Sequence, residues 1–369
     1  MDAAESDAQP GHDGGAAGDG RAGPGSGRGN YLSTDSGKSA RNGLTTGRMD
    51  VGEAPWVGGG GSSSGRTEPA ETSTTTRPGR FAIGVIGAGR VGPTLGAALE
   101  RAGHSVVAAS GVSDASRRRA AEMLPGVPLL PVPDVAARAD LVLLTVPDDT
   151  LADLAAGLAS TGAIRQGHIV VHTSGRHGTA VLAPVLRAGA LPLALHPAMT
   201  FTGTSVDLAR LAGCSFGVTA PEAFRPMAEA LVVEMGGEPE WIAEENRALY
   251  HAALASGANH LVTLVTQAAD LLRAAGVAQP GHMLGPLLGA ALDNALRSGD
   301  AALTGPVARG DAQTVAAHLA ELDRIAPDSP VRAAYLAMAR LTADRALAAG
   351  LLSPQQAEPL LDVLGGGER

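Results

Sequence analysis

Lysine, cysteine and aromatic residues are almost missing from this sequence of 369 residues. Lys38 is the only lysine, Cys214 is the only cysteine, and aromatic residues make up 2% of the chain. A single cysteine excludes a disulfide within the chain, and no basic segment followed by an apolar run marks a secretory signal, so we expect a cytoplasmic protein. Because Lys38 lies in a segment that we do not expect to fold, the cations of the folded part must be arginine or protonated histidine.

An excess of acidic residues narrows the range of partners. The chain has 37 Asp and Glu against 28 Lys and Arg, which gives a formal net charge of -9. Such a chain lacks the basic surface and the aromatic stacking platform of nucleic-acid binding, and it suits anionic membrane surfaces poorly. We therefore expect a small-molecule substrate, with no nucleic acid and no membrane as partner.

The composition changes sharply near residue 80. Residues 1–80 are rich in Gly, Ser, Thr and Asp and hold few large aliphatic side chains. Their burial could not offset a backbone entropy cost of about 1–2 kcal/mol per ordered residue. We predict a disordered tail over 1–80, a dinucleotide-binding domain over 81–243 and a helical domain over 244–369.

Short apolar runs alternate with helical stretches from residue 81 to about residue 242. This alternation predicts an α/β fold with a doubly wound, mostly parallel sheet, because parallel strands covered on both faces are apolar throughout. The predicted strands are Phe81–Ile86, Ser105–Ala109, Leu141–Val146, His168–His172, Leu191–Leu195 and Ser215–Val218. Helices between them are expected at, for example, Val91–Ala102 and Thr150–Ser160.

Strand signals disappear beyond Glu244, and the rest of the chain is predicted to be all-α. The expected helices lie near Glu245–Ala275, His282–Ser298, Ala312–Ile325, Pro330–Ala349 and Pro354–Leu364. Two windows, Ala248–Ala269 and Ala274–Leu292, carry no formal charge, and their length alone would permit a membrane span. Polar residues and prolines interrupt both windows, so we predict helices that are buried in a bundle or in a homodimer formed through the helical domain.

A glycine-rich turn follows the first predicted strand and opens the first predicted helix. Its residues are Gly87, Ala88, Gly89, Arg90, Val91 and Gly92. In a G-x-G-x-x-G turn the first glycine allows the tight bend, the second lets a pyrophosphate approach the backbone, and the third lets helix and strand pack closely. The helix N-terminus adds free N–H groups and a positive dipole end. We therefore predict an NAD(P) site at these six residues, extended by Ser110, Val146 and Pro147.

The residues after the second predicted strand indicate whether the site prefers NAD or NADP. An NAD site usually has Asp or Glu at that strand end, whereas this sequence has Ser110, followed by the run Arg117-Arg118-Arg119. Arginine can grip a phosphate with two hydrogen bonds, so the run favours NADP, with Arg117 and Arg118 on the 2′-phosphate. The alternatives are that the arginines form a solvated helix face and that Asp114 serves NAD.

Several segments resemble a known superfamily. They are Thr145–Asp149, Val171–Gly175, His196–Phe201, Tyr250–His260 and Leu303–Asp311. Over roughly residues 81–345 the chain resembles ketopantoate reductase, pyrroline-carboxylate reductase, prephenate dehydrogenase and 6-phosphogluconate dehydrogenase. It resembles more closely a bacterial family of Rossmann-like NADP oxidoreductases whose C-terminal domain has no assigned function. The resemblance implies a Rossmann domain, a helical C-terminal domain and an active site in the cleft between them.

The chain departs from this superfamily at the proton donor. Several relatives, ketopantoate reductase among them, use a lysine on the first long helix of the second domain, and here Lys38 is the only lysine. Prephenate dehydrogenase instead uses a His-Pro histidine with a serine at an earlier strand end, which His196-Pro197 and Ser174 resemble. The resemblance therefore implies a catalytic His196 and a nearby Ser174.

General chemistry supports the same two residues. Ligands of open α/β sheets bind at the carboxyl ends of the strands, where Pro147, Ser174 and His196 follow predicted strands. Reduction of a carbonyl or imine needs a proton donor, and histidine titrates near neutral pH. We expect His196 to donate the proton and Ser174 to orient the substrate oxygen. The alternatives are a turn histidine before a proline and a serine that caps the next helix.

Other polar residues have simpler explanations. Asp148 and Asp149 are expected to cap a helix rather than to catalyse, and His172 either lines the crevice or is a satisfied core histidine. Asp311 is expected to cap the helix that starts at Ala312. Arg309 could still reach an anionic group of the substrate.

A polar stripe without charge runs along the helix predicted over Glu245–Ala275. At 100° per residue its members fall within an arc of about 100°; they are Ser256, Asn259, His260, Thr263 and Gln267. A solvent-facing stripe would normally carry Lys, Glu or Arg, so we expect this one to line the cleft, with Ser256, Asn259 and His260 as catalytic candidates. Contact with a partner helix is the alternative. His251 lies off this arc.

These features predict an NADP-dependent oxidoreductase, with NAD as the second cofactor choice, that acts on a small, carboxylated carbonyl, imine or hydroxy compound. No residue is assigned as a metal ligand. A different class also fits the sequence, namely an NAD(P)-binding sensor or scaffold without catalysis, which the missing lysine favours.

Overall fold

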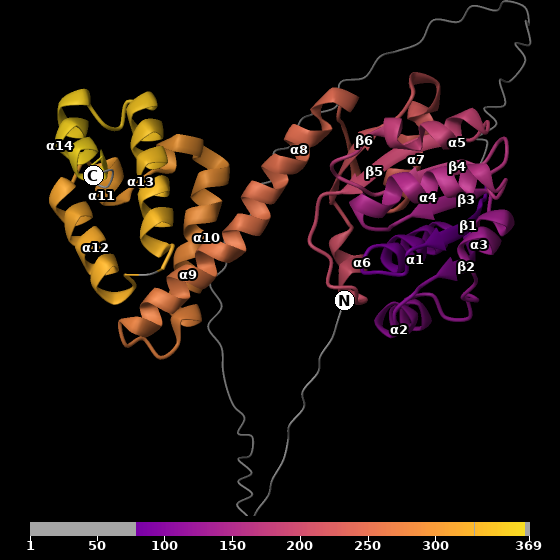
Figure 1. Ribbon diagram of the computed structural model, residues 1–369, viewed down its shortest axis with the longest axis horizontal. Helices are drawn as coiled ribbons and strands as arrows, with labels where there is room; N and C mark the ends of the chain where they lie inside the picture. The colour runs from indigo at the N-terminus through magenta and orange to yellow at the C-terminus, as the bar shows by residue number, and fades with distance from the viewer. Residues whose placement is uncertain (1–78, 328, 366–369) are drawn as a thin grey trace, which may run out of the picture. The chain divides into compact units, whose positions relative to one another are not determined.

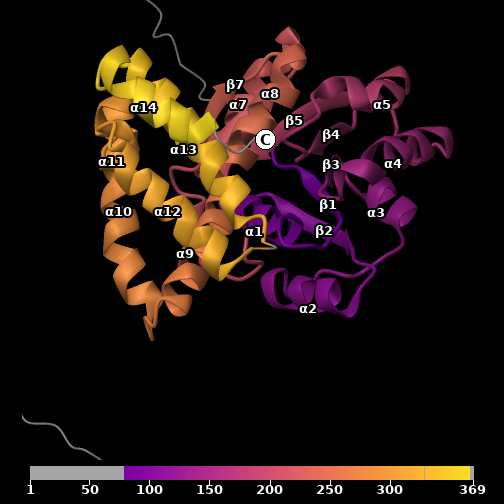
Figure 2. The ribbon, with the colours of Figure 1, turned by 60° about the vertical axis from the view of Figure 1, so that its left-hand side comes forward.

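The computed structural model describes residues 79–327 and 329–365. The disordered tail that the sequence predicts lies, apart from its last two residues, outside the described residues. The described chain is an α/β domain followed by a run of helices (Figures 1 and 2), which confirms the predicted fold class.

A seven-stranded sheet forms the centre of the α/β domain. Its order is β2-β1-β3-β4-β5-β6-β7, and every neighbouring pair is parallel except β5 and β6. The strands are β1 (Ala82–Ile86), β2 (Ser105–Ser110), β3 (Leu141–Leu144), β4 (Ile169–His172), β5 (Leu191–Pro197), β6 (Ser215–Thr219) and β7 (Glu238–Trp241). Six of them match the predicted strands to within two residues. The sequence analysis missed β7, an edge strand that contains Pro239 and has no apolar run.

Helices cover both faces of the sheet and bury two separate apolar cores. The first core packs α1 (Gly92–Ala102) and α7 (Arg225–Glu234) against one face. The second packs α3 (Val132–Arg138), α4 (Asp148–Ser160) and α5 (Ala183–Arg187) against the other. The buried strands are therefore apolar on both sides, as the continuous apolar runs of the sequence require.

The strand order reverses direction at β1. The chain passes from β1 to β2 on one side and then to β3 on the other, so β1 lies between them. Such a switch point leaves a crevice at the carboxyl ends of the strands, where open α/β sheets bind their ligands. The glycine-rich turn follows β1 at this point.

A long helical rod leads out of the α/β domain. It begins with α8 (Arg247–Leu254), continues through the π-helical turn η4 (Ala255–Asn259) and ends with α9 (His260–Ala274), as Figure 1 shows. The sequence predicts one uninterrupted α-helix here, and the π turn is the difference. Among the residues of α9, none is buried.

The remaining helices are α10 (Pro280–Ser298), α11 (Gly305–Ala308), α12 (Ala312–Ile325), α13 (Val331–Ala348) and α14 (Pro354–Gly365). The last four share an apolar core of their own around Val315, Ala343 and Leu360. Within the described part of the chain, no helix combines the length and the apolar character that crossing a bilayer requires.

Candidate functional site

The glycine-rich turn has the geometry that its sequence predicts. Gly87 has a φ of 105°, and a Cβ there would lie 2.6 Å from the carbonyl oxygen of Thr145. A Cβ on Gly92 would lie 2.5 Å from the carbonyl oxygen of Gly87, so only glycine permits this approach of helix α1 to the turn. A Cβ on Gly89 would meet no atom within 4 Å. The space over Gly89 is the space that a pyrophosphate needs.

Neighbouring strands hold the turn in place. The backbone N–H groups of Gly87 and Ala88 donate to the carbonyl oxygen of Ser110 at 3.2 and 2.8 Å. Directly after β3, the Thr145 hydroxyl donates to the carbonyl oxygen of Gly87 at 2.6 Å. Thr145 was not among the predicted site residues, although it precedes Val146 directly.

A cavity of about 500 Å³ opens beside the turn. Its lining includes six of the predicted cofactor residues, namely Gly87, Ala88, Gly89, Ser110, Val146 and Pro147. Gly111, Val112, Ser113 and Ser116 extend the lining along the end of β2 and the start of α2 (Asp114–Met123). This is the place where an adenine ribose would lie in a dinucleotide-binding fold.

The arginine run lies on α2 and does not act as one patch. Arg117 pairs with Asp114 through an N–O distance of 3.1 Å, and both side chains are exposed. Arg118 is exposed as well. Neither Arg117 nor Arg118 is among the residues that line the 500 Å³ cavity. Their assignment to a 2′-phosphate stays a prediction.

His196 lies at the carboxyl end of β5 and is paired with a tyrosine that the sequence analysis did not select. The hydroxyl oxygen of Tyr250 is 2.8 Å from Nδ1 of His196, and the rings meet edge to face. Gly217, opposite His196 on β6, leaves room for this tyrosine, because a Cβ there would lie 2.6 Å from its ring.

A buried arginine lies beneath this pair. The Arg247 side chain is 1% exposed. Its Nε donates to the Thr219 hydroxyl at 2.7 Å, and its Nη2 donates to the carbonyl oxygens of Ala194 and Gly217 at 3.1 and 3.0 Å. Its Nη1 is buried and has no hydrogen-bond partner among the described residues. No carboxylate is bonded to this guanidinium in the described chain, so its positive charge acts on its neighbours.

The surroundings keep His196 neutral. Burial, the positive charge of Arg247 and the nearby His251 lower the pKa of His196 from 6.5 to about 4. The sequence analysis expected titration near neutral pH, and the structure does not support that expectation. Burial outweighs the opposing effects of Arg247 and the Gly217 backbone and raises the pKa of Tyr250. A protonated Tyr250 can therefore donate to Nδ1 of His196, which leaves the ring proton on Nε2.

His251 and Asn259 share a second cavity with His196. This cavity has a volume of about 310 Å³, and Met199, Thr200 and Leu254 contribute to its lining. A Cβ on Gly175 would lie 2.7 Å from Cδ2 of His251 and 3.0 Å from Nε2 of His196, so both rings close on this glycine. His196 Nε2 thus lies on the side of His251.

The π turn explains why the sequence analysis set His251 aside. A π turn contains more residues per turn than an α-helix, so each residue advances by less than 100°. Over Ala255–Asn259 this delay brings His251 and Asn259 to the same cavity. Ser256 and His260 are exposed and lie outside the cavity lining. Thr263 and Gln267 line a different cavity, together with Val331.

His172 is a satisfied core histidine. It is fully buried, Nδ1 accepts the backbone N–H of Ser174 at 3.2 Å, and Nε2 lies 2.8 Å from the carbonyl oxygen of Gly178. Ser174 is buried beside it, and its hydroxyl oxygen accepts the backbone N–H of His177 at 3.2 Å. Ser174 therefore holds a local turn, and it is not among the residues lining the cavity of His196.

Two predicted helix caps have different outcomes. Asp311 caps α12, because it accepts the backbone N–H of Thr314 at 3.0 Å. The prediction for Asp148 and Asp149 was wrong: Pro147 occupies the N-cap position, and the two carboxylates lie in the first turn of α4, where the helix dipole favours negative charge. Arg309 is exposed and lines neither cavity described above.

Glu244 and Arg247 tie the start of the helical rod to the sheet domain. The Glu244 carboxylate accepts the backbone N–H groups of Thr179 and Ala180 at 2.7 and 3.1 Å. Arg247 reaches β5 and β6, as described above. Sequence reasoning missed both residues, and the only available signal was their position directly before a long charge-free window.

Fold and turn together define a Rossmann-like protein with a helical C-terminal part. Two family models match the chain, a Rossmann-like domain over residues 67–197 and a domain of unknown function, DUF2520, over residues 214–342. The chain therefore combines these two domains, which confirms the family that the sequence resembles. No curated protein is similar enough to count as a match.

Several solved structures share the fold. A Bacteroides fragilis protein named as a putative NADP oxidoreductase is 23% identical, with a TM-score of 0.61 over 72% of this chain and 98% of that chain. An imine reductase of Myxococcus stipitatus in complex with NADP+ is 20% identical, with a TM-score of 0.54 over 71% of this chain and 94% of that chain. A Thermotoga maritima protein is 21% identical, with a TM-score of 0.52 over 71% and 98%.

Proposed function

We propose that this protein is an NADP-dependent oxidoreductase for a small, carboxylated carbonyl, imine or hydroxy compound. The observation that carries the proposal is the position of the His196–Tyr250 pair at the carboxyl end of the sheet that also carries the glycine-rich turn. The fold shared with an imine reductase that binds NADP+ supports the same reaction class.

The residues beside His196 suggest how a proton reaches the substrate. A bound nicotinamide cofactor would supply the hydride, so reduction of a C=O or C=N bond would require one further proton. His196 passes its Nε2 proton to the substrate oxygen or nitrogen while Nδ1 takes the Tyr250 hydroxyl proton. The guanidinium of Arg247, 5.8 Å from the tyrosine ring, stabilises the tyrosinate that results. Tyr250 then regains a proton from solvent.

This relay removes the need for a lysine. A neutral histidine cannot release a proton alone without forming an imidazolate, so its second nitrogen must receive one in the same step. Tyr250 is bonded to that nitrogen, and the charge of Arg247 has no bonded carboxylate among the described residues. Proton transfer by a positioned acid typically contributes about 10²–10⁴-fold to turnover.

Turnover of NADPH tests the proposal. Purified protein is incubated with NADPH and a panel of small keto and imino acids, and absorbance of the reduced nicotinamide is followed. Substrate-dependent oxidation of NADPH supports the oxidoreductase. Binding of NADPH without turnover on any substrate favours the sensor or scaffold instead.

We further propose that two copies of the chain associate through α9 and α10. Large apolar side chains of both helices are exposed: Val262, Leu287 and Leu292 are 66%, 62% and 51% exposed. Identical copies carry identical charges, so a face inside the charge-free windows 248–269 and 274–292 avoids self-repulsion. Light scattering after gel filtration should give a dimer for the native chain and a monomer for Leu287→Asp. Leu341→Asp on α13, with 51% exposure at Leu341, is the matched control and should stay dimeric.

A further inference from the structure

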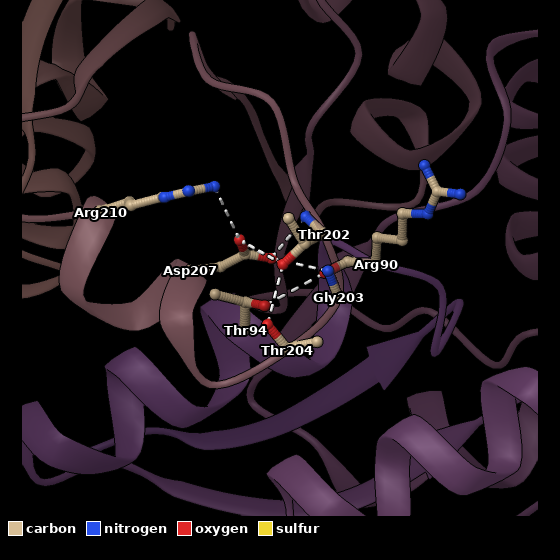
Figure 3. Close-up of polar contacts among 7 residues, drawn as sticks. All are labelled: Arg90, Thr94, Thr202, Gly203, Thr204, Asp207 and Arg210. Atoms are coloured by element: carbon tan, nitrogen blue, oxygen red, sulfur yellow. Dashed lines mark hydrogen bonds and ion pairs between the residues drawn. The ribbon is translucent and has the colours of Figure 1, made fainter. Parts of the chain in front are cut away.

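A buried carboxylate shapes the loop that follows β5. Asp207 is fully buried, and its carboxylate accepts the backbone N–H groups of Thr202 and Gly203 at 2.8 and 2.7 Å and the Thr202 hydroxyl at 2.9 Å. Its nearest cation is Arg210, at an N–O distance of 4.0 Å. Figure 3 shows these contacts converging on the carboxylate. The loop Thr202–Asp207 is therefore held in one conformation from within.

This conformation presents a glycine backbone to two arginine side chains. Gly203 has a φ of 80°, in the left-handed region. A Cβ there would lie 2.9 Å from Nε of Arg119 and 3.1 Å from Cγ of Arg90. Because both atoms lie close to one point, the two arginines are neighbours on the loop, and Figure 3 shows Arg90 beside Gly203.

Arg119 differs from the other arginines of its run. Successive helix residues point about 100° apart, so Arg117, Arg118 and Arg119 face three directions. Arg117 turns to Asp114 and Arg118 to solvent, whereas Arg119 is half-buried against the loop. Among residues 79–327 and 329–365, neither Arg90 nor Arg119 has a carboxylate partner. Two arginine side chains that meet at Gly203 and have no carboxylate partner favour a nearby anion.

Both arginines lie next to residues of the cofactor cavity, although neither is part of its lining. Arg90 follows Gly89, and Arg119 lies one helical turn beyond Ser116, on the same face of α2. Gly89 and Ser116 both line the 500 Å³ cavity. This end of the cavity lies at the carboxyl end of β2, where the adenine ribose of a dinucleotide binds.

We propose that Arg90 and Arg119, positioned by the loop Thr202–Asp207, bind the 2′-phosphate of NADP and that this loop thereby sets the preference for NADP over NAD. The proposal rests on the proposed function only through cofactor binding. Gly203 is a positioning residue in it, because it acts through the arginines. Arg117 and Arg118 have no part in the contact.

Binding of cofactor fragments isolates the phosphate contact from catalysis. Adenosine 2′,5′-bisphosphate and 5′-AMP differ in the 2′-phosphate alone, and calorimetry measures the affinity of the intact protein for each. We expect Arg119→Ala to lower the affinity for the bisphosphate about tenfold or more relative to the affinity for 5′-AMP. The reason is that a hydrogen bond to a charged group is worth about 1.5–3 kcal/mol. Arg117→Ala should leave this ratio unchanged. Arg119→Lys keeps the charge and should recover part of the loss.

A pair of glycine variants tests the loop. Gly203→Ala places a methyl group against both arginines, and we expect the same loss of preference for the 2′-phosphate as with Arg119→Ala. Gly213→Ala is the matched control, since Gly213 has a φ of 75° but no atom within 4 Å of its Cβ position. It carries the same backbone strain and should leave the ratio of affinities unchanged. A general effect of strain would lower the melting temperature of both variants equally.

The outcomes separate this proposal from the proposed function. Equal losses for both fragments in Arg119→Ala would place the arginine on another phosphate and overturn the proposal. If Arg117→Ala, but not Arg119→Ala, abolishes the preference for the bisphosphate over 5′-AMP, the exposed Arg117 binds the 2′-phosphate and the proposal is wrong. A native protein that binds neither NADPH nor the bisphosphate would overturn the proposed function itself.

Discussion

The Tyr250 hydroxyl lies 2.8 Å from Nδ1 of His196, and this hydrogen bond joins the helical rod to the carboxyl end of β5. It decides which nitrogen of the imidazole faces the cavity. With Nδ1 occupied by the tyrosine, Nε2 is left for a substrate. The sequence analysis selected the histidine for its neutral-pH titration, whereas the structure pairs it with a tyrosine, on which the proposed relay is built.

Replacing Tyr250 by Phe tests this relay. Tyr250→Phe keeps the ring that fills the space left by Gly217 and removes the hydroxyl. We expect turnover to fall by about 10²-fold or more, with NADPH affinity near that of the native protein. His196→Asn should give a similar loss, and the double variant should lose little more, because the two residues act in one step. Additive losses in the double variant would contradict a shared step.

The two histidines of the helical rod offer a matched comparison. His251 lines the cavity of His196, whereas His260 is exposed and outside it. We expect His251→Asn to lower turnover with a verified substrate and His260→Asn to leave it unchanged. Steady-state kinetics measures both. The reverse result would mean that the stripe identified from the sequence, rather than the cavity, holds the substrate.

Alanine substitutions at two glycines of the turn should impair different properties, cofactor affinity in one case and stability in the other. A methyl group on Gly89 meets no atom of the chain, so Gly89→Ala should melt like the native protein but bind NADPH about tenfold or more weakly, because it fills the pyrophosphate space. A methyl group on Gly92 meets the carbonyl of Gly87, so Gly92→Ala should lose roughly 1–3 kcal/mol of stability. Thermal melting and fluorescence titration separate the two effects. Unchanged NADPH affinity in Gly89→Ala would remove the turn from the binding site.

Buried histidines should make the protein sensitive to mild acid. Burial lowers the pKa of both His172 and His196 from 6.5 to about 4. Between these values the unfolded chain binds more protons than the native one, so the free energy of unfolding falls as the pH drops from 6.5 towards 4. The slope is up to about 1.4 kcal/mol per pH unit for each histidine.

Urea unfolding at pH 7, 6 and 5 measures this slope. His172→Gln should be less stable at pH 7 because it disturbs a buried hydrogen-bonded site, yet its stability should depend less on pH. His282→Gln, at an exposed position of α10, is the control and should keep the native slope. An identical slope in His172→Gln and the native protein would show that His172 titrates as it does in the unfolded chain.

Most of the sheet could be predicted from local sequence because its buried strands are continuous apolar runs. Strand β3, for example, is buried on both faces and consists of apolar residues alone. The edge strand β7 has no such requirement, and its sequence Glu238-Pro-Glu-Trp resembles a loop. The glycine turn could be predicted as well, since a side chain at any of its three glycines would block a separate close approach.

The site could be predicted only in part, because its second half depends on contacts between distant segments. Tyr250 is 54 residues from His196, and nothing in either local sequence indicates their pairing. Arg247 stands before a long apolar window and would be expected at the surface, yet it is buried under β5 and β6. The π turn changes which residues share one side of the helix. A helical wheel drawn at 100° per residue assumes a regular α-helix and therefore misses this change.

The hydrogen bonds that hold the glycine turn have a thermodynamic consequence. Ser110 at the end of β2 and Thr145 directly after β3 fix Gly87 and Ala88, so a dinucleotide cofactor would meet a surface that is already ordered. Little backbone entropy is then lost on binding, and more of the contact free energy remains as affinity. The heat capacity change of cofactor binding should accordingly reflect the surface that the cofactor itself covers, with no added contribution from folding of a loop.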